Sequence, residues 1–373
     1  MVSRLSWGDR ARELRNRVLS SPRFQSWAIR LPGTRAIARR RAKKLFDLCA
    51  GFVYSQVLLA CVQLRLFDEL AEGPRTASVL ARRLALPEES CERLLRAAVS
   101  LGLLERRSGG RFGLGGLGAA FLGNPGIAEM VAHHPLLYSD LSDPVALLRG
   151  EIEQTELGRF WPYARAADRR ALGREGIAPY TTLMSASQSL VARQVLDAYP
   201  LERHRCLLDV GGGDGAFLET VASRAPDLRL VCFDLPPVAE LAQERFSRRG
   251  LSHRATAVGG DFHSDPLPEG ADVVSLVRII CDQDDDEALA LLRAVRHAMS
   301  PDAVLLLAES MAETEGAEPI GDAYFGLYLL AMGSGRARSA TELRELVQAA
   351  GFRDVRIVPT RMPLQAGLLV ARS

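Results

Sequence analysis

The chain has few of the features that mark secreted, disulfide-bonded, metal-binding or membrane-spanning proteins. None of its six cysteines has a partner at C-x-x-C spacing, so reduced thiols are expected rather than disulfides or zinc ligation. No uninterrupted run reaches about 18 apolar residues, which argues against a transmembrane helix. The arginine-rich N-terminus lacks the apolar segment of a signal peptide. Together these absences predict a cytoplasmic protein without a bound metal.

Net charge is also nearly absent, because the formal charge is +2 over 373 residues. A molecule this neutral is not expected to bind nucleic acid through its overall charge. The balance is uneven, however: residues 1–44 hold thirteen Arg and Lys side chains against Asp9 and Glu13. Residues 1–40 are therefore predicted to form a basic arm in which aromatic residues such as Trp7 and Trp27 alternate with arginines. Such an arm could lie on an anionic membrane surface, remain solvated, or embrace a second copy.

The most informative stretch is Asp209–Gly215, with the sequence D-V-G-G-G-D-G. It follows an apolar run and precedes a helical pattern, so a strand feeds a glycine-rich turn that opens a helix. Glycine lets a ligand approach the backbone where a side chain would clash. Nineteen residues after Gly215 a second apolar strand ends in Asp234, whose carboxylate could accept hydrogen bonds from two ribose hydroxyls. These two features predict a nucleoside site at the carboxyl ends of parallel strands.

Two kinds of ligand fit this loop. Gly211, Gly213 and Ala216 match the dinucleotide fingerprint G-x-G-x-x-G/A, which would place a pyrophosphate at the helix N-terminus. Asp214 would repel such a diphosphate, and Asp209 could bind a cationic amino group. S-adenosylmethionine has a ribose, an amino acid and no phosphate, so we favour a methyltransferase over a dehydrogenase.

Further cofactor contacts are expected on neighbouring elements. Asp261 and Phe262 follow the third predicted strand and could bind an adenine amino group and stack on its ring. Arg278, near the end of the fourth strand, could face the ribose or the carboxylate. Met184 and Gln188 share one face of a helix predicted at 180–199, and that face looks either at the core or at the cofactor. The predicted cofactor residues are Asp209, Gly211, Gly213, Asp234, Leu235, Asp261, Phe262, Arg278, Met184 and Gln188.

Strands and helices alternate from residue 206 onward, as in a doubly wound α/β sheet. A late hairpin predicts an antiparallel final strand, which separates a Rossmann-like methyltransferase sheet from a plain dinucleotide fold. The seven predicted strands are 206–210, 229–233, 254–258, 272–277, 303–308, 354–359 and 366–372.

The preceding part of the chain is predicted to be mostly helical. A helix is expected over 41–72, and residues 76–114 give a helix, a turn, a second helix and a glycine-rich hairpin, which is a winged-helix pattern. Winged helices often read DNA, but the second helix here carries Glu92 beside Arg93 and Arg96, so packing or dimerisation is favoured. Residues 1–40 are thus assigned to the arm, 41–179 to a dimerisation and substrate-side domain, and 180–373 to the cofactor domain.

This constellation resembles the class I S-adenosylmethionine-dependent O-methyltransferases that carry an N-terminal dimerisation domain. The resemblance covers residues 41–373 and implies S-adenosylmethionine as cofactor and a homodimer. Its motifs are Asp209–Gly215, Phe233–Pro236, Gly260–Phe262 and Arg278–Asp282.

The N-terminal part also looks like that of the bacterial carotenoid enzymes, the hydroxyneurosporene (demethylspheroidene) O-methyltransferases. The residues that carry this likeness are Ser21–Phe24, Leu45–Leu48, Ala50–Phe52, Ser55–Leu58 and Phe160–Tyr163. The resemblance implies an acceptor with a tertiary hydroxyl at the end of a long polyene. A membrane-dissolved acceptor of this kind would give the basic arm a purpose.

One departure from the wider family concerns proton removal. The family usually has His-Asp after the fourth strand, whereas this chain has Cys281-Asp282; Glu309 after the fifth strand is kept. A tertiary alcohol is less acidic than a phenol, whose pKa is about 10, and a neutral thiol would be a poor base for it. We therefore expect catalysis mainly by alignment, with Asp282, Glu309 or water taking the proton and Cys281 either catalytic or merely shaping the pocket.

Three other functions remain open from the sequence. The chain could methylate a soluble phenol or polyketide, although the missing histidine counts against this. It could be a ligand-sensing DNA-binding regulator that uses the winged helix. It could also bind the cofactor without catalysis.

Overall fold

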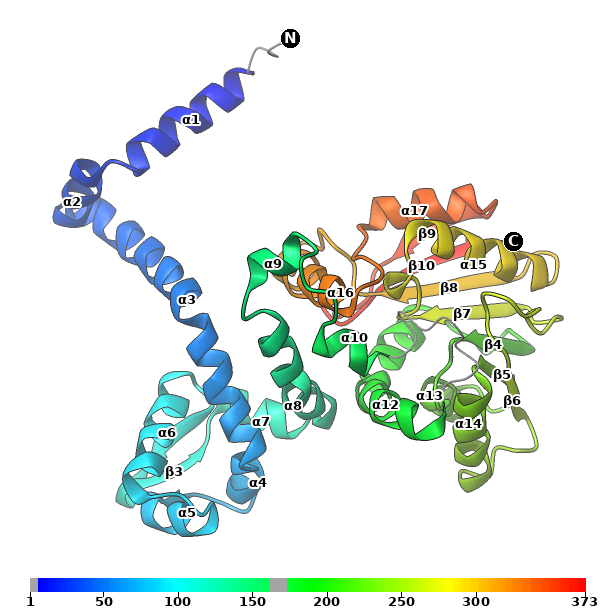
Figure 1. The fold of residues 1–373 in the computed structure, drawn as a ribbon, viewed down its shortest axis with the longest axis horizontal. Helices are drawn as coiled ribbons and strands as arrows, with labels where there is room; N and C mark the ends of the chain where they lie inside the picture. Colours follow the sequence, from blue (N-terminus) through cyan, green and yellow to red (C-terminus); the bar gives the residue numbers. More distant parts are fainter. Residues whose placement is uncertain (1–5, 162–172) are drawn as a thin grey trace. The chain divides into compact units, whose positions relative to one another are not determined.

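The computed structural model describes residues 6–161 and 173–373 (Figure 1). Pro162 and Tyr163, which belong to the stretch Phe160–Tyr163 that carries the family likeness, lie outside this range. The chain divides into two compact units, Met1–Ala120 and Phe121–Ser373, and each is described by itself. The sequence boundaries at residues 40 and 179 divide the chain by expected role and stay predictions.

The first unit is mostly helical, and short turns separate the helices of its N-terminal arm. The helix predicted over 41–72 is in fact two helices, because Arg65 takes a left-handed conformation with φ of 53° between them. The first of these, α3, begins earlier than predicted, at Pro32, so the arm runs into it without a break. The helices of this unit are α1 (Trp7–Leu19), α2 (Pro22–Arg30), α3 (Pro32–Gln63), α4 (Leu66–Ala71), α5 (Ala77–Arg83), α6 (Glu88–Ser100) and α7 (Gly116–Leu122), the last running across the boundary.

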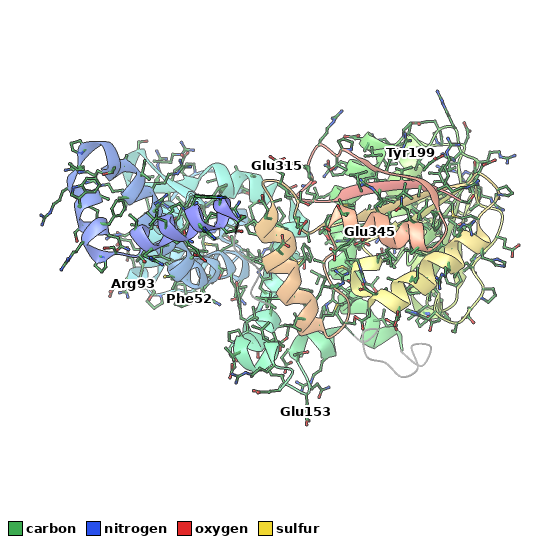
Figure 2. All side chains as sticks on the ribbon, turned by 90° about the horizontal axis from the view of Figure 1, so that it is seen from above. Phe52, Arg93, Glu153, Tyr199, Glu315 and Glu345 are labelled. Atoms are coloured by element: carbon green, nitrogen blue, oxygen red, sulfur yellow. The ribbon has the colours of Figure 1, made fainter. Side chains whose placement is uncertain are left out.

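Helix α3 is long and apolar enough to cross a membrane by length and composition alone, with a window of mean hydropathy 1.8. The sequence argument against a spanning helix was therefore too strong, because it required an uninterrupted apolar run. Only 11% of that window is buried, and large apolar side chains such as Phe46 and Phe52 are exposed on it (Phe52 is labelled in Figure 2). The exposed apolar surface of α3 could therefore contact either a membrane or another protein.

The predicted winged helix is confirmed. Helices α5 and α6 are followed by strands β2 (Leu104–Arg107) and β3 (Arg111–Leu114), which pair antiparallel, and β1 (Arg75–Thr76) joins β3 on its other side. Leu80, Leu95 and Leu104 are almost fully buried and form its core. On α6, Arg93 and Arg96 each pair with a glutamate four residues earlier, so much of their charge is compensated within the helix.

The second unit holds a seven-stranded sheet with the order β6-β5-β4-β7-β8-β10-β9 (Figure 1). The first five strands in this order are parallel, and β10 runs antiparallel between β8 and β9. The predicted fold class is thereby confirmed, and each predicted strand boundary agrees to within one residue. The strands are β4 (Cys206–Val210), β5 (Arg229–Asp234), β6 (Ala255–Gly259), β7 (Val273–Val277), β8 (Val304–Glu309), β9 (Arg353–Val358) and β10 (Gly367–Arg372).

Helices cover both faces of this sheet, and side chains that alternate along each strand fill two separate cores. On β4, Leu207 packs in the core beneath α12 (Arg174–Ala198), α13 (Ala216–Arg224) and α14 (Pro236–Arg248). Its neighbour Leu208 packs in the opposite core, beneath α15 (Asp285–Ala298) and α17 (Ala340–Ala349). With both faces buried, the polar ends of the parallel strands are the part of the sheet left for a ligand.

A third cluster of apolar and aromatic side chains lies beside the sheet and is built from distant segments. It includes Leu137, Leu157, Trp161, Tyr328 and Met332. The contributing elements are α8 (Pro125–Asp140), α9 (Pro144–Leu148), α10 (Glu156–Phe160), the π-helical segment Pro319–Phe325 and α16 (Gly326–Met332).

Candidate active site

One large cavity opens at the carboxyl ends of the parallel strands and is bounded on one side by α12. Its empty volume is about 1050 Å³, counted to its open mouth, which is enough for a nucleoside and part of a second molecule. Ten of the thirteen predicted site residues line it: Met184, Gln188, Gly211, Gly213, Asp234, Leu235, Asp261, Phe262, Arg278 and Asp282. Asp209, Cys281 and Glu309 are not part of the lining.

The glycine-rich loop and Asp234 form one hydrogen-bonded unit. The Gly213 N–H donates to Asp234 Oδ2 at 2.8 Å, and the Leu235 N–H donates to Oδ1 at 2.8 Å. Gly213 has a φ of 60°, and a Cβ there would point into open space rather than into protein. Burial is the largest influence on the carboxyl and raises the pKa of Asp234 to about 6. The loop thus presents backbone and a fixed acid to the cavity.

Asp209 lies beneath this loop. It is 1% exposed, and Ser275 Oγ donates to its Oδ1 at 2.6 Å, while its Oδ2 is buried without a hydrogen-bond partner in the described part of the chain. Burial raises the pKa of Asp209 to about 7. The geometry favours a supporting role for this carboxylate under Gly212 over the direct cofactor contact that the sequence suggested.

Asp214 lines the cavity, but its charge is compensated. Arg245 of α14 pairs with Asp214 and also with Glu219 at 2.8 Å. The repulsion of a diphosphate by Asp214 is therefore weaker than the sequence implied. Asp234 and Asp261 have no such arginine partner among the described ion pairs. Their carboxylates, rather than that of Asp214, therefore favour a ligand without phosphate.

The end of β6 supplies a second polar position. Asp261 is 9% exposed, and the His263 N–H donates to its Oδ1 at 3.0 Å. The rings of Phe262 and His263 lie 4.6 Å apart at the cavity wall. A carboxylate beside an aromatic face fits an adenine, with its amino group on the acid and its ring on the phenyl group.

Arg278 connects the sheet to α12. It has a left-handed φ of 58°, which is unusual for a residue with a side chain. Its guanidinium donates to Met184 O at 2.9 Å, to Ser187 Oγ at 2.8 Å and to Gln188 Oε1, while its Nε is buried and has no partner within residues 6–161 and 173–373. The α12 face with Met184 and Gln188 thus looks at the cavity, which resolves the alternative left open by the sequence.

Three acidic groups gather behind the turn that follows β7. Cys281 Sγ lies 3.3 Å from Asp282 Oδ1. Glu309 is 2% exposed; its Oε1 accepts the N–H groups of Ile279 and Ile280 at 3.0 and 2.8 Å, and its Oε2 has no hydrogen-bond partner among the described residues. Only Asp282 of the three reaches the cavity wall.

Burial dominates the protonation of this group. It raises the pKa of Asp282 to about 7, with the charge of Glu309 as the next cause. It also raises the pKa of the Cys281 thiol well above its usual range, helped by both carboxylates. At neutral pH Cys281 is therefore a neutral thiol, and the pKa of Asp282 lies near that pH.

Arg338 holds this turn in place and was missed by the sequence reasoning. Its guanidinium is 2% exposed and donates to Ile280 O at 2.7 Å, Gln283 O at 2.8 Å and Asp285 Oδ1 at 2.7 Å. These bonds bracket the Cys281-Asp282 pair from both sides. Nothing in the sequence around Arg338 indicates a contact with a turn some 55 residues away.

One part of the cavity wall is aromatic. The Trp161 and Tyr180 rings lie 4.2 Å apart and both line the cavity with Met332. Trp161 Nε1 donates to the Tyr328 hydroxyl at 3.2 Å, and His133 Nε2 lies 2.8 Å from the same hydroxyl. Burial lowers the pKa of His133 to about 4, so this histidine is a weak base, and its hydrogen bond holds the Tyr328 hydroxyl.

The residues at the cavity fit S-adenosylmethionine. Asp234 offers carboxylate oxygens for a ribose diol, Asp261 and Phe262 fit the adenine, and the open space beside Gly213 lets a ligand approach the backbone. No group of three or more metal-binding side chains occurs among the described residues.

Comparison with known proteins decides the family. The O-methyltransferase domain family matches residues 138–353, and the O-methyltransferase dimerisation domain matches residues 46–124. The chain belongs to the O-methyltransferase family. It is an S-adenosylmethionine-dependent enzyme of class I, and the cofactor predicted from the sequence is confirmed.

Individual O-methyltransferases agree with this assignment. The chain is 45% identical to the demethylspheroidene O-methyltransferase of Cereibacter sphaeroides over 95% of this chain and 93% of that protein. It is 33% identical to the acetylserotonin O-methyltransferase of Mus musculus over 91% of both chains. The crystal structure of human N-acetylserotonin methyltransferase in complex with SAM superposes with a TM-score of 0.75, at 27% identity, over 89% of this chain and 97% of that one.

Proposed function

We propose that this O-methyltransferase acts on the tertiary hydroxyl of an acyclic carotenoid of the hydroxyneurosporene or demethylspheroidene type. The relatives named for demethylspheroidene support this, since two of them are 45% and 40% identical over 95% of the chain. The 33% identity to an acetylserotonin enzyme makes a soluble hydroxyl acceptor a weaker choice.

The observation that carries the proposal is the acceptor side of the cavity. Trp161, Tyr180 and Met332 give it an apolar wall, which suits a hydrocarbon better than a polar acceptor. The turn after β7 places the neutral Cys281 thiol where the family usually has a histidine base. A site without that base suits an alcohol that keeps its proton until late in the reaction.

The chain's own residues have three tasks in such a transfer. S-adenosylmethionine supplies the methyl group, as an electrophilic carbon on a positively charged sulfur. Asp234, Asp261 and Phe262 hold the nucleoside, and the aromatic wall aligns the acceptor oxygen with the methyl carbon and excludes water. Alignment of this kind can contribute roughly 7–11 kcal/mol to lowering the barrier.

Proton removal falls to Asp282 in this proposal. With S-adenosylmethionine bound to supply the methyl group, the acceptor hydroxyl would pass its proton to the Asp282 carboxylate, the only member of the acidic group that lines the cavity. Glu309 acts as a positioning residue, since it holds the turn through Ile279 and Ile280 and its charge keeps Asp282 basic.

Two further expectations belong to this proposal. A dimerisation domain is present at residues 46–124, and we propose that the enzyme is a homodimer. We also propose a cytoplasmic location peripheral to the inner or photosynthetic membrane, where a carotenoid acceptor would be dissolved.

The proposal is tested by methyl transfer from radiolabelled S-adenosylmethionine to hydroxyneurosporene in detergent, beside caffeate as a soluble phenol. Label on the carotenoid alone is the expected result. Label on the phenol alone would contradict the carotenoid assignment and leave a soluble acceptor. Cofactor binding without transfer to either would point to another acceptor or to a non-catalytic role.

A further inference from the structure

Helix α1 has an apolar stripe that no other described part of its own unit, Met1–Ala120, covers. Trp7, Ala11, Leu14 and Val18 follow the spacing i, i+4, i+7 and i+11, so they share one face of the helix. No residue of α1 is buried, and Trp7 and Leu14 are 87% and 62% exposed. A soluble helix with this pattern normally packs its stripe on a core, so the stripe needs another partner.

The charges of α1 are arranged around this stripe. Arg10 and Arg17 flank it on one side and Arg15 on the other, whereas Asp9 and Glu13 lie on the far side. The Arg10 guanidinium lies over the Trp7 ring at 5.8 Å, and Asp9 is paired with Arg12 at 3.4 Å, away from the stripe. Arginines beside an apolar face can lay their stems along it and keep their charge in the headgroup region of a membrane.

The following helix, α2, also exposes large apolar side chains in a basic segment. On α2, Trp27 and Ile29 are 52% and 53% exposed, although Ala28 between them is buried. The excess of eleven positive charges within residues 1–44 would make two such arms repel one another. The family's dimerisation domain begins at residue 46, beyond both helices, so dimer formation does not by itself account for them.

We propose that α1 is an in-plane membrane-binding helix that docks on an anionic lipid surface, with Trp7, Leu14 and Val18 in the acyl boundary and Arg10, Arg15 and Arg17 at the phosphates. Apolar burial and electrostatic attraction act together on such a helix, and the attraction weakens with salt. The inference does not depend on the identity of the acceptor, although a bilayer-soluble acceptor would give it a purpose.

The test is flotation of the full-length protein with vesicles of phosphatidylcholine alone or with phosphatidylglycerol. We expect binding to the anionic vesicles at least about tenfold tighter than to the neutral ones, and a several-fold loss between about 0.05 and about 0.5 M salt. Brominated lipid should quench Trp7 fluorescence, and this quenching should disappear in Trp7→Phe.

A matched pair of variants separates the stripe from charge alone. Leu14→Asp and Asn16→Asp each add one negative charge to α1, but only the first lies on the stripe. Leu14→Asp should lose about tenfold or more in vesicle affinity, while Asn16→Asp should lose less than about threefold. Equal losses in the two variants, or no binding of the wild type to anionic vesicles, would overturn the proposal.

Two more measurements test membrane docking of α1 separately from the proposed carotenoid acceptor. If Leu14→Asp instead shifts the protein from dimer to monomer in sedimentation without affecting vesicle binding, the stripe contacts a second copy and the membrane proposal is wrong. Methyl transfer to a carotenoid in detergent should be unchanged in Leu14→Asp but reduced when the same acceptor is embedded in vesicles. Vesicle binding without any carotenoid methylation would support the docking helix and contradict the acceptor assignment.

Discussion

The two sides of the cavity are built in different ways. The cofactor side consists of backbone groups and acids at the ends of adjacent strands, and its central contact joins Gly213 to Asp234, 21 residues apart. The acceptor side joins residues far apart in the chain: Trp161 and His133 meet on Tyr328, 167 and 195 residues away. A cofactor side built from adjacent strand ends can serve reactions with many different acceptors. The acceptor side instead depends on how helices from distant parts of the chain pack together.

The largest effect should come from breaking the cofactor side at its centre. Asp234→Ala removes the acceptor of two backbone N–H groups and the predicted ribose contact. Losing about 3 kcal/mol of charged hydrogen bonding would raise the Kd for S-adenosylhomocysteine about 100-fold, measured by calorimetry. Asp227→Ala, on an exposed loop before β5, is the control and should bind as the wild type does. A change of less than about threefold in Asp234→Ala would show that this acid is not the centre of the site.

Asp282 lies where the cofactor side and the acceptor side meet. Replacing it should change the reaction rate without changing cofactor binding. Asp282→Asn should lower kcat about 100-fold or more and leave the Kd of S-adenosylhomocysteine within about twofold, because a positioned base contributes typically 10²–10⁴-fold. A base works when deprotonated, so wild-type kcat should rise as the pH increases through about 7. That rise should be absent from Asp282→Asn.

The control for this change is Asp286→Asn, which removes an exposed acid from the first turn of α15. It should keep both the rate and the pH profile. A pH profile of Asp282→Asn that still rises near pH 7 would assign the proton to another group, such as Glu309 or water.

The same contrast between the two sides explains which parts of the fold and the site could be predicted from the sequence. The strands, the late antiparallel β10, Asp234 and Phe262 were predictable because strand pattern and loop chemistry are local. Asp209 was predicted to contact the cofactor directly, whereas in the structure it lies beneath the loop and is bonded to Ser275. Its residue type alone does not tell whether its side chain points into the cavity or toward Ser275. Arg338 and Tyr328 could not be found, because their partners are set by packing between segments that the sequence does not bring together.

A smaller effect should come from the acceptor side. Tyr328→Phe removes the hydroxyl between His133 and Trp161 and leaves a buried indole N–H without its acceptor. Freed from this bond, the Trp161 ring is less well held, and we expect the KM for the acceptor to rise about tenfold with cofactor affinity unchanged, since an unpaired buried donor costs about 1–3 kcal/mol.

Tyr324→Phe is a close control for that variant. Tyr324 makes the equivalent bond to His134 at 3.0 Å, but no bond links it to Trp161 in the described structure. If the two variants raise the acceptor KM equally, the effect is general loosening of the cluster, and the connection from Tyr328 to Trp161 has no special importance.

The smallest effect should come from Cys281, although it stands where the family usually has its base. Its thiol is neutral at neutral pH, and its bond to Asp282 lowers the pKa of that carboxyl slightly against the larger effect of burial. Cys281→Ala removes this donor, so the pKa of Asp282 should rise and the increase of kcat with pH should move to higher pH. Cys281→Ser supplies a stronger donor and should move it the other way. Both variants should keep kcat at high pH within about threefold of wild type, because the group that takes the proton is still present; a much larger loss in Cys281→Ala would make the thiol itself part of the chemistry.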